Sequence, residues 1–293
     1  MNHPLLSVLA VQHPEWRPVV AGIDEAVREG ARPSWARAVP AIRYNGRGGR
    51  PLLHGAVIEL TSGEVARWIV RILDVKASAG DATPVALSRA VAAELIDPLL
   101  VMEVAVTQDP QQVAELARAL DTDPMVLATH MPLIARPLLQ ACRRAWARRV
   151  PHDWSAGYCP ICGDCPVLAE VRGHDGWRRL RCGSCGADWP GRWLCCPFCG
   201  EQEEERLGSL LSTETAARHS VEVCDGCGGY IKGIVTATPM SGADVVLYDL
   251  TTPELDTAAA DRGHRRPVGK GHELAVSVVR RPSRLRRLFG FSA

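Results

Sequence analysis

The chain has 293 residues, 46% of them hydrophobic, and a formal net charge of +1 at pH 7. This length is sufficient for one or two domains with a hydrophobic core. The near-zero charge excludes a bulk field that would draw the protein to nucleic acid or to an anionic membrane. No apolar run approaches the roughly 18 residues of a membrane span, and the first residues lack the basic start of a signal peptide. We therefore expect a cytoplasmic protein whose cysteines stay reduced.

The first 150 residues show the apolar periodicity of helices, with apolar side chains at three- and four-residue steps. Pro98 marks a kink or boundary, and Asp109 followed by proline is typical of a helix start. The predicted helices are His13 to Arg28, Gly63 to Val75, Val85 to Val106, Asp109 to Leu120, and Pro124 to Val150 with interruptions at Pro132 and Pro137. Arg43 to Pro51 is a loop by composition. No acids, bases or nucleophiles cluster in this half, so we predict an all-helical domain over residues 1–150.

The composition changes after a boundary segment at Pro151 to Ala156, where cysteine, glycine and tryptophan become frequent. Short runs follow that have the length of strands. The predicted strands are Val167 to Val171, Trp177 to Arg181, Gly208 to Leu211, Val221 to Val223, Tyr230 to Val235 and, further on, Ala275 to Val279. Arg280 to Phe291 alternates arginine with apolar residues. We favour a solubilising terminus there over a basic amphipathic segment that binds a partner.

Ten of the eleven cysteines lie between Tyr158 and Lys232. Eight of them form four C-x-x-C pairs, each followed by glycine: Cys159/Cys162, Cys182/Cys185, Cys196/Cys199 and Cys224/Cys227. The two-residue spacer lets both thiolates bind one ion, and glycine permits the positive φ that such a turn needs. Four of these turns in one region predict two metal sites, each with four cysteine ligands.

Two groupings of the four turns are possible. In the sequential grouping, one ion is bound by Cys159, Cys162, Cys182 and Cys185, and the other by Cys196, Cys199, Cys224 and Cys227. In the interleaved grouping, the first and third turns share an ion, as do the second and fourth. We favour the sequential grouping because the segments inside each unit are short predicted strands. Four thiolates in a tetrahedron suit zinc or iron, and the closed ligand set argues against hydrolytic metal catalysis.

Several residues near the turns have more than one interpretation. Cys165 and Cys195 are either competing ligands or, as we favour, free thiols, and Cys142 is expected to be a small buried hydrophobe. Four thiolates on a divalent ion leave a net charge of −2, which nearby cations can offset. The candidate cations are Arg178, Arg179, Arg181 and Arg192.

Three segments of the cysteine-rich region resemble the FdhE family, the formate dehydrogenase accessory proteins. They are CPICGDCPVLAEV from Cys159, RRLRCGSCGADWPGRWLCCPFCG from Arg178, and VCDGCGGYIKGI from Val223, with Tyr230 and Lys232 in the most diagnostic part. The resemblance implies a cytoplasmic assembly factor for molybdenum- or tungsten-containing formate dehydrogenases, which contacts the catalytic subunit before export or final assembly. It also implies a helical domain followed by two rubredoxin-like metal units, with iron linked to the eight cysteines.

We therefore predict an α+β chain with a helical domain at 1–150, metal units at 151–192 and 193–255, and a basic tail at 256–293. The leading hypothesis is a non-enzymatic accessory factor that binds the catalytic subunit of a formate dehydrogenase and supports its maturation. One alternative is an iron-dependent redox protein that passes electrons to a client. Another is a zinc-ribbon nucleic-acid-binding protein, which the neutral charge disfavours. Nothing in the sequence indicates the oligomeric state.

Overall fold

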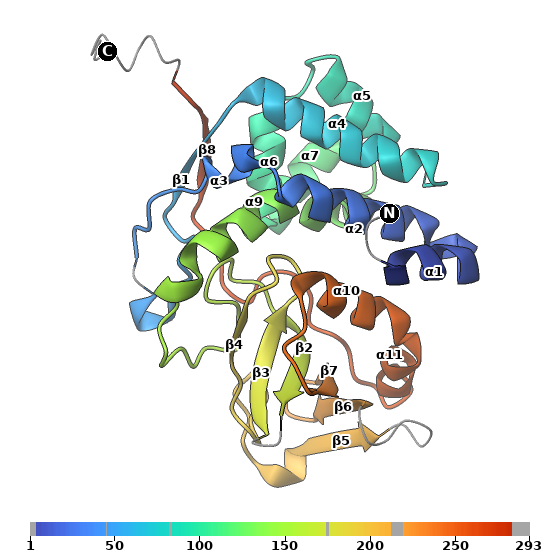
Figure 1. Ribbon diagram of the computed structural model, residues 1–293, viewed down its shortest axis with the longest axis vertical. Coiled ribbons are helices and arrows are strands. Elements are labelled where there is room, and N and C mark those ends of the chain that lie inside the picture. Colours follow the sequence, from blue (N-terminus) through green and yellow to red (C-terminus); the bar gives the residue numbers. More distant parts are fainter. Residues whose placement is uncertain (1–3, 45, 82–83, 174–175, 212–218, 283–293) are drawn as a thin grey trace. The chain divides into compact units, whose positions relative to one another are not determined.

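The computed structural model describes residues 4–44, 46–81, 84–173, 176–211 and 219–282 (Figure 1). The described chain divides into two compact units. The helical unit takes its residues from Met1–Ile42, Gly55–Ala141 and Ala275–Ala293, and the sheet unit from Arg43–His54 and Cys142–Leu274. The loop at 43–54 groups with the sheet unit because the backbone N–H groups of Leu52 and Leu53 donate to the carbonyls of Pro160 and Ile161.

Helices make up most of the helical unit. They are α1 (Pro4–Gln12), α2 (Arg17–Gly30), α3 (Pro33–Ala36), α4 (Ser62–Ser78), α5 (Val85–Ala92), α6 (Pro98–Thr107), α7 (Pro110–Ala119), α8 (Pro124–Ala128) and α9 (Met131–Trp146), whose last residues belong to the sheet unit. Within the described residues, no helix is both long enough and apolar enough to cross a membrane.

Three of these helices begin with the same local device. Asp97, Asp109 and Asp123 each accept a hydrogen bond from a backbone N–H in the first turn, and each is followed by proline. The carboxylate satisfies an N–H that has no partner inside the helix, and proline is already set to helical φ. The predicted helix start at Asp109 and the predicted boundary at Pro98 are therefore confirmed.

The last predicted helical region is interrupted near Pro132, as expected, but not at Pro137. α8 ends at Ala128 and α9 begins at Met131, so Pro132 lies in the first turn, where its missing N–H has no helical partner to lose, whereas Pro137 lies inside α9. The helix continues there because it buries an apolar face that includes Ile134, Leu138 and Leu139, all fully inaccessible to solvent. Burial of three side chains of this size stabilises the helix by several kcal/mol, which exceeds the roughly 3 kcal/mol that a proline costs inside a helix.

A two-stranded parallel sheet, which the sequence predicted only in part, completes the helical unit. β1 (Val57–Leu60) pairs with β8 (Ser277–Arg280), in the register Val57↔Ser277 to Leu60↔Arg280. The strand expected at Ala275 to Val279 is thus present, whereas β1 was assigned no structure. Part of the segment expected as a basic tail is ordered because its backbone completes this sheet. The last part of that segment, residues 283–293, lies outside the described residues.

The described part of the sheet unit is built on a six-stranded sheet, with α-helices packed against it. Its strands are β2 (Pro166–Arg172), β3 (Trp177–Cys182), β4 (Asp188–Pro190), β5 (Leu207–Leu211), β6 (His219–Cys224) and β7 (Gly229–Thr236). All five strands predicted in this region are present, in the spatial order β4-β3-β2-β7-β6-β5. The centre is a parallel pairing of β2 with β7, with Leu168 opposite Lys232. The segments that carry the two predicted metal units therefore share one sheet.

One face of this sheet is covered by α10 (Gly242–Thr251) and α11 (Pro253–Ala260) (Figure 1). The buried cluster between them consists of Leu168, Val221, Val223, Tyr230, Val245, Tyr248, Leu255 and Ala259. Ser241 and Asp244 form a reciprocal capping box that begins α10. The segment expected to close the second metal unit, Asp244 to Leu255, is therefore helical and packs against the sheet.

Candidate metal centres

The first group of four cysteines lies at the end of the β2/β3 hairpin. The Sγ atoms of Cys159, Cys162, Cys182 and Cys185 all lie within 4.8 Å of one another. The Sγ–Sγ distance is 3.5 Å between Cys159 and Cys185 and again between Cys162 and Cys182. A disulfide requires about 2.05 Å, so these are separate thiols. Zinc–sulfur bonds of about 2.3 Å in a tetrahedron place the sulfurs roughly 3.8 Å apart, so the group has the size of a four-sulfur metal site.

The second group has the same composition and size. The Sγ atoms of Cys196, Cys199, Cys224 and Cys227 also lie within 4.8 Å of one another. The Sγ–Sγ distance is 3.8 Å between Cys196 and Cys227 and 3.7 Å between Cys199 and Cys224. The structure thus brings the eight cysteines together in the sequential grouping and not in the interleaved one.

All four turns have the backbone geometry that their glycines predicted. Gly163, Gly186, Gly200 and Gly228 have φ values of 75°, 77°, 79° and 69°. Each of these glycines donates its backbone N–H to the carbonyl of the first cysteine of its pair, as Gly228 does to Cys224 at 2.8 Å. Residues with a Cβ atom rarely adopt this left-handed conformation. The turn therefore places both thiols of a pair on one side without help from distant residues.

Backbone N–H groups also point at sulfur in the first group. Ile161 donates to Cys159 Sγ at 3.5 Å, and Cys185 donates to Cys182 Sγ at 3.4 Å. Burial raises the pKa of Cys159 well above that of a free thiol. A fully buried group cannot hold four thiolates without a compensating cation. The four sulfur donors, their spacing and their burial therefore fit a tetrahedral divalent ion. Because all four coordination positions would be taken by sulfur, none would be open to a substrate or water.

The two groups differ in their exposure to solvent. In the first, no cysteine is more than 1% exposed. In the second, Cys196 and Cys224 are buried, whereas Cys199 and Cys227 are exposed. The first centre is enclosed by the protein, and the second lies at its surface.

The arginines that we expected to offset the thiolate charge have other partners. Arg178 forms an ion pair with Glu222, Arg179 with Asp188, and Arg181 with Glu170. Arg192 donates to the side chain of Gln202. Three of them link β3 to acids of other strands: Arg178 to β6, Arg179 to β4 and Arg181 to β2.

A lysine that the sequence analysis did not select lies beside the first group instead. The Nζ atom of Lys270 donates to the carbonyl oxygen of Cys162 at 3.0 Å and pairs with Asp164. Burial raises the pKa of Asp164, although Lys270 opposes this shift. The residue is far from the turns in sequence, so only the tertiary structure reveals its position.

The surplus cysteines are not members of either group. Cys165 is half-buried, and its backbone N–H donates to the Gly269 carbonyl. Burial raises the pKa of Cys165 to about 11 and that of Cys142 to about 12, so both are thiols at neutral pH. Cys195 is half-buried and contacts the carbonyl of Cys196 through its thiol.

A buried polar network adjoins the second group, and its role was not evident in the sequence. Lys232, fully inaccessible to solvent, forms ion pairs with Asp249 at 3.2 Å and Asp256 at 2.7 Å. The hydroxyl of Tyr230 donates to Asp256 at 2.6 Å, and Arg266 pairs with Asp249. Tyr230 and Lys232, the most diagnostic residues of the FdhE-like segment, therefore tie β7 to α10 and α11.

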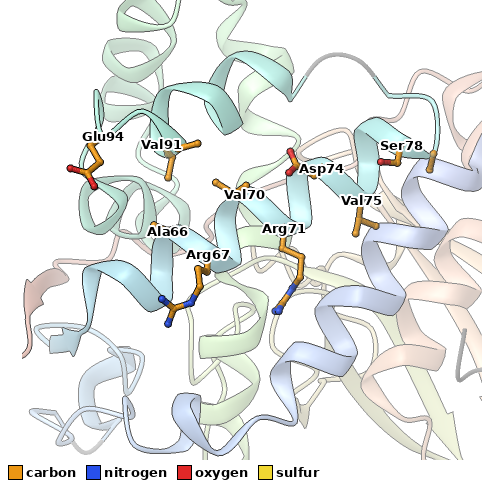
Figure 2. A pocket seen from close by; sticks show the side chains of 11 residues that line it. Ala66, Arg67, Val70, Arg71, Asp74, Val75, Ser78, Val91 and Glu94 are labelled. Carbon is orange, nitrogen blue, oxygen red and sulfur yellow. The ribbon is translucent and has the colours of Figure 1, made fainter.

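The helical unit offers a groove, and its described residues include no third group of metal-ligating side chains. A hollow of about 760 Å³ runs along α4 and α5 and is lined by small and apolar side chains such as Val70 and Val91. Figure 2 shows Val91 and Glu94 on one side of α4, while the guanidinium groups of Arg67 and Arg71 extend toward the other. This mixture of charges has no single chemical character, and we assign the groove no ligand.

These features define a class: a two-unit α+β protein with a helical unit and a sheet unit that holds paired four-cysteine centres. No known family model matches the chain. An FdhE homolog from Edwardsiella ictaluri is 34% identical over 110 residues, which are 37% of this chain and 35% of that protein. One from Aquifex aeolicus is 31% identical over 113 residues, and protein FdhE from Escherichia coli O127:H6 is 31% identical over 120 residues. These matches span less than two-fifths of each relative, 39% and 38% for the last two.

The fold also matches a solved structure. The crystal structure of the FdhE protein from Pseudomonas aeruginosa aligns with a TM-score of 0.56 and 21% sequence identity, over 90% of this chain and 91% of that one. The chain is thus similar in sequence to proteins named FdhE over part of its length, and it shares the fold of one of them over most of its length.

Proposed function

We propose that the chain is an accessory factor for a formate dehydrogenase, that it acts in the cytoplasm, and that it binds the catalytic subunit and supports its maturation. The observation that carries the proposal is the pair of four-cysteine groups within a fold that matches an FdhE crystal structure. The FdhE-like segments supply the link to formate dehydrogenase. In this proposal the eight cysteines bind two ions, iron or zinc, which hold the sheet unit in one shape.

The structure provides reasons to favour binding over catalysis. Four thiolates around each ion leave no position for a substrate or water. Two strongly buried charged groups of the sheet unit, Lys232 and Glu170, are each paired with an opposite charge inside that unit. Their contacts rigidify a surface, which is what a docking protein needs.

Co-purification tests this proposal. A tagged chain is expressed in its own cells with formate metabolism induced, and bound proteins are identified by mass spectrometry. We expect the catalytic subunit of a formate dehydrogenase in the eluate, and none with a variant that carries Cys182→Ser and Cys224→Ser. Repeated absence of that subunit, with the wild-type chain intact and metal-loaded, would contradict the proposal.

A redox role is the second candidate, and the exposure of Cys199 and Cys227 favours it, because a partner can approach the second centre closely. It requires iron, which changes oxidation state, whereas zinc does not. Metal analysis, together with absorption spectra recorded before and after reduction, distinguishes iron from zinc in these centres. A colourless, zinc-filled protein would exclude electron transfer through these centres.

A further inference from the structure

A groove lies on the face of the six-stranded sheet opposite α10 and α11, beside the second centre. It has a volume of about 420 Å³, and we call it the docking groove. Buried Ile231 forms part of its lining, together with Phe198 and Val235. Cys196 and Cys224 also line it, so the groove and the second centre are continuous. The turn that binds the metal therefore also shapes this surface.

Large apolar side chains at the groove are exposed. Trp193, Leu194 and Val235 are 57%, 65% and 46% accessible to solvent. Leu194 has a φ of 47°, a left-handed conformation that is unfavourable for a residue with a Cβ atom. Neither exposure nor this conformation stabilises the free protein. Strain and apolar exposure at one place are typical of a surface that binds something.

The strand beside this groove lies at the edge of the sheet. Among the residues that the structure describes, β5 pairs with β6 on one side only and forms one end of the sheet. Its sequence, LGSLL, contains neither the lysine nor the proline that commonly blocks pairing at an edge, and Gly208 and Ser209 are exposed. The opposite edge, β4, has three residues and ends in Pro190. An extended segment can therefore add to the sheet at β5 but not equally at β4.

The charges next to β5 determine which kind of segment fits. Glu203, Glu204 and Glu205 precede the strand and are exposed, and Glu204 lines the groove. The neighbouring Arg206 forms an ion pair with Glu201. In the described part of the chain, none of these three glutamates takes part in an ion pair. Their charges are available to basic residues of a partner, and like charges would be repelled.

We propose that the docking groove binds an extended segment of a partner protein, one that alternates apolar side chains and carries basic residues beside them. The segment adds as a strand along β5, its apolar side chains enter the groove at Leu207 and Leu194, and its basic residues meet the three glutamates. This inference rests on the proposed function: the partner is the catalytic subunit of the formate dehydrogenase.

The affinity of the purified full-length chain for that purified catalytic subunit tests the apolar part. Leu207→Glu places a charge where apolar side chains dock, and we expect binding at least tenfold weaker. Val268→Glu is the matched control, because Val268 is 81% exposed and does not line the groove. Metal content and circular dichroism establish that both variants fold. Equal affinity of the Leu207→Glu and Val268→Glu variants would overturn the inference while leaving the proposed function in place.

The contribution of the three glutamates to binding is tested in the same affinity assay. Glu203→Gln with Glu204→Gln should weaken binding about threefold at low salt and less at high salt. Glu254→Gln with Asp261→Asn, also exposed and equal in charge change, should have no effect. If both pairs act alike, the glutamates do not contact the partner and the inference fails.

Hydrogen exchange on the complex tests the added strand. Successive N–H groups of an edge strand point alternately inward and outward, so the β5 amides that point away from β6 should become protected when the catalytic subunit binds, while those of β4 should not change. Unchanged exchange in β5 would contradict strand addition. A wild-type chain that does not bind the catalytic subunit at all would remove the proposed function and this inference together, which separates that failure from loss of the groove alone.

Discussion

Cysteines of one sequence pattern acquire different environments in this protein. The C-x-x-C-G spacing was enough to predict that the eight cysteines gather at four such turns, because a turn is a local structure. The partner of Lys270 was not predictable, since its ion pair with Asp164 joins residues far apart in the sequence. The same holds for Lys232, whose charge is balanced by two aspartates on later helices. Sequence motifs identify ligands, but not the residues that surround them.

Replacement of one ligand should affect one centre. We expect Cys182→Ser to lose about half of the bound metal and to destabilise the sheet unit by several kcal/mol, because three buried thiolates then lack their shared ion. Cys142→Ala is the control, since Cys142 is buried outside both groups and should cost about 1 kcal/mol. Metal analysis and urea unfolding provide the readout. Full metal content in the Cys182→Ser variant would contradict the site.

A histidine in the helical unit should make stability depend on pH. Burial and the neighbouring Lys76 lower the pKa of His130 to about 4 from 6.5, and Lys76 Nζ lies 2.8 Å from its Nδ1 atom. The unfolded chain takes up this proton near pH 6.5 and the folded chain only near pH 4. The free energy of unfolding should therefore fall by roughly 1 to 2 kcal/mol between pH 7 and pH 5.

The variant His130→Gln has no such proton to bind, so its unfolding free energy should change less over this range. Urea unfolding at pH 7, 6 and 5 compares the two proteins. If the unfolding free energy changed equally with pH in the wild type and the variant, His130 would not be held neutral in the folded protein.

At the scale of elements, the two cysteine hairpins place their centres at different depths. Cys199 and Cys227 are exposed, whereas the four cysteines of the first group are not. A chelator should therefore remove one ion much faster than the other. Alkylation during this treatment, mapped by mass spectrometry, should reach Cys199 and Cys227 before Cys159. Simultaneous release of both ions would mean that the two centres are equally protected.

The strand β8 should stabilise the helical unit, although its sequence is short and partly basic. The backbone N–H of Val278 donates to the Glu103 carboxylate, and that of Arg281 donates to the carbonyl of Leu60. A chain that ends at residue 274 loses these bonds and should unfold at lower temperature by several degrees. A chain that ends at 282 keeps them and serves as the control. Equal melting temperatures would show that β8 contributes nothing.

The elements of the whole molecule were more predictable than their arrangement. Helix periodicity and strand alternation identified most segments, because each pattern repeats within a few residues. The parallel pairing of β2 with β7 was not predictable, since it joins the two cysteine units through residues such as Leu168 and Lys232 that no local pattern connects. β1 was missed for the same reason: its partner β8 lies near the other end of the chain.

One measurement tests the central claim of an accessory factor most directly: formate dehydrogenase activity in cells that lack this gene. We predict that activity is largely lost while the catalytic subunit is still made, and that the wild-type gene restores it. A Cys182→Ser, Cys224→Ser variant should not restore activity, whereas Cys142→Ala should. Unchanged formate dehydrogenase activity in the deletion strain would contradict the claim.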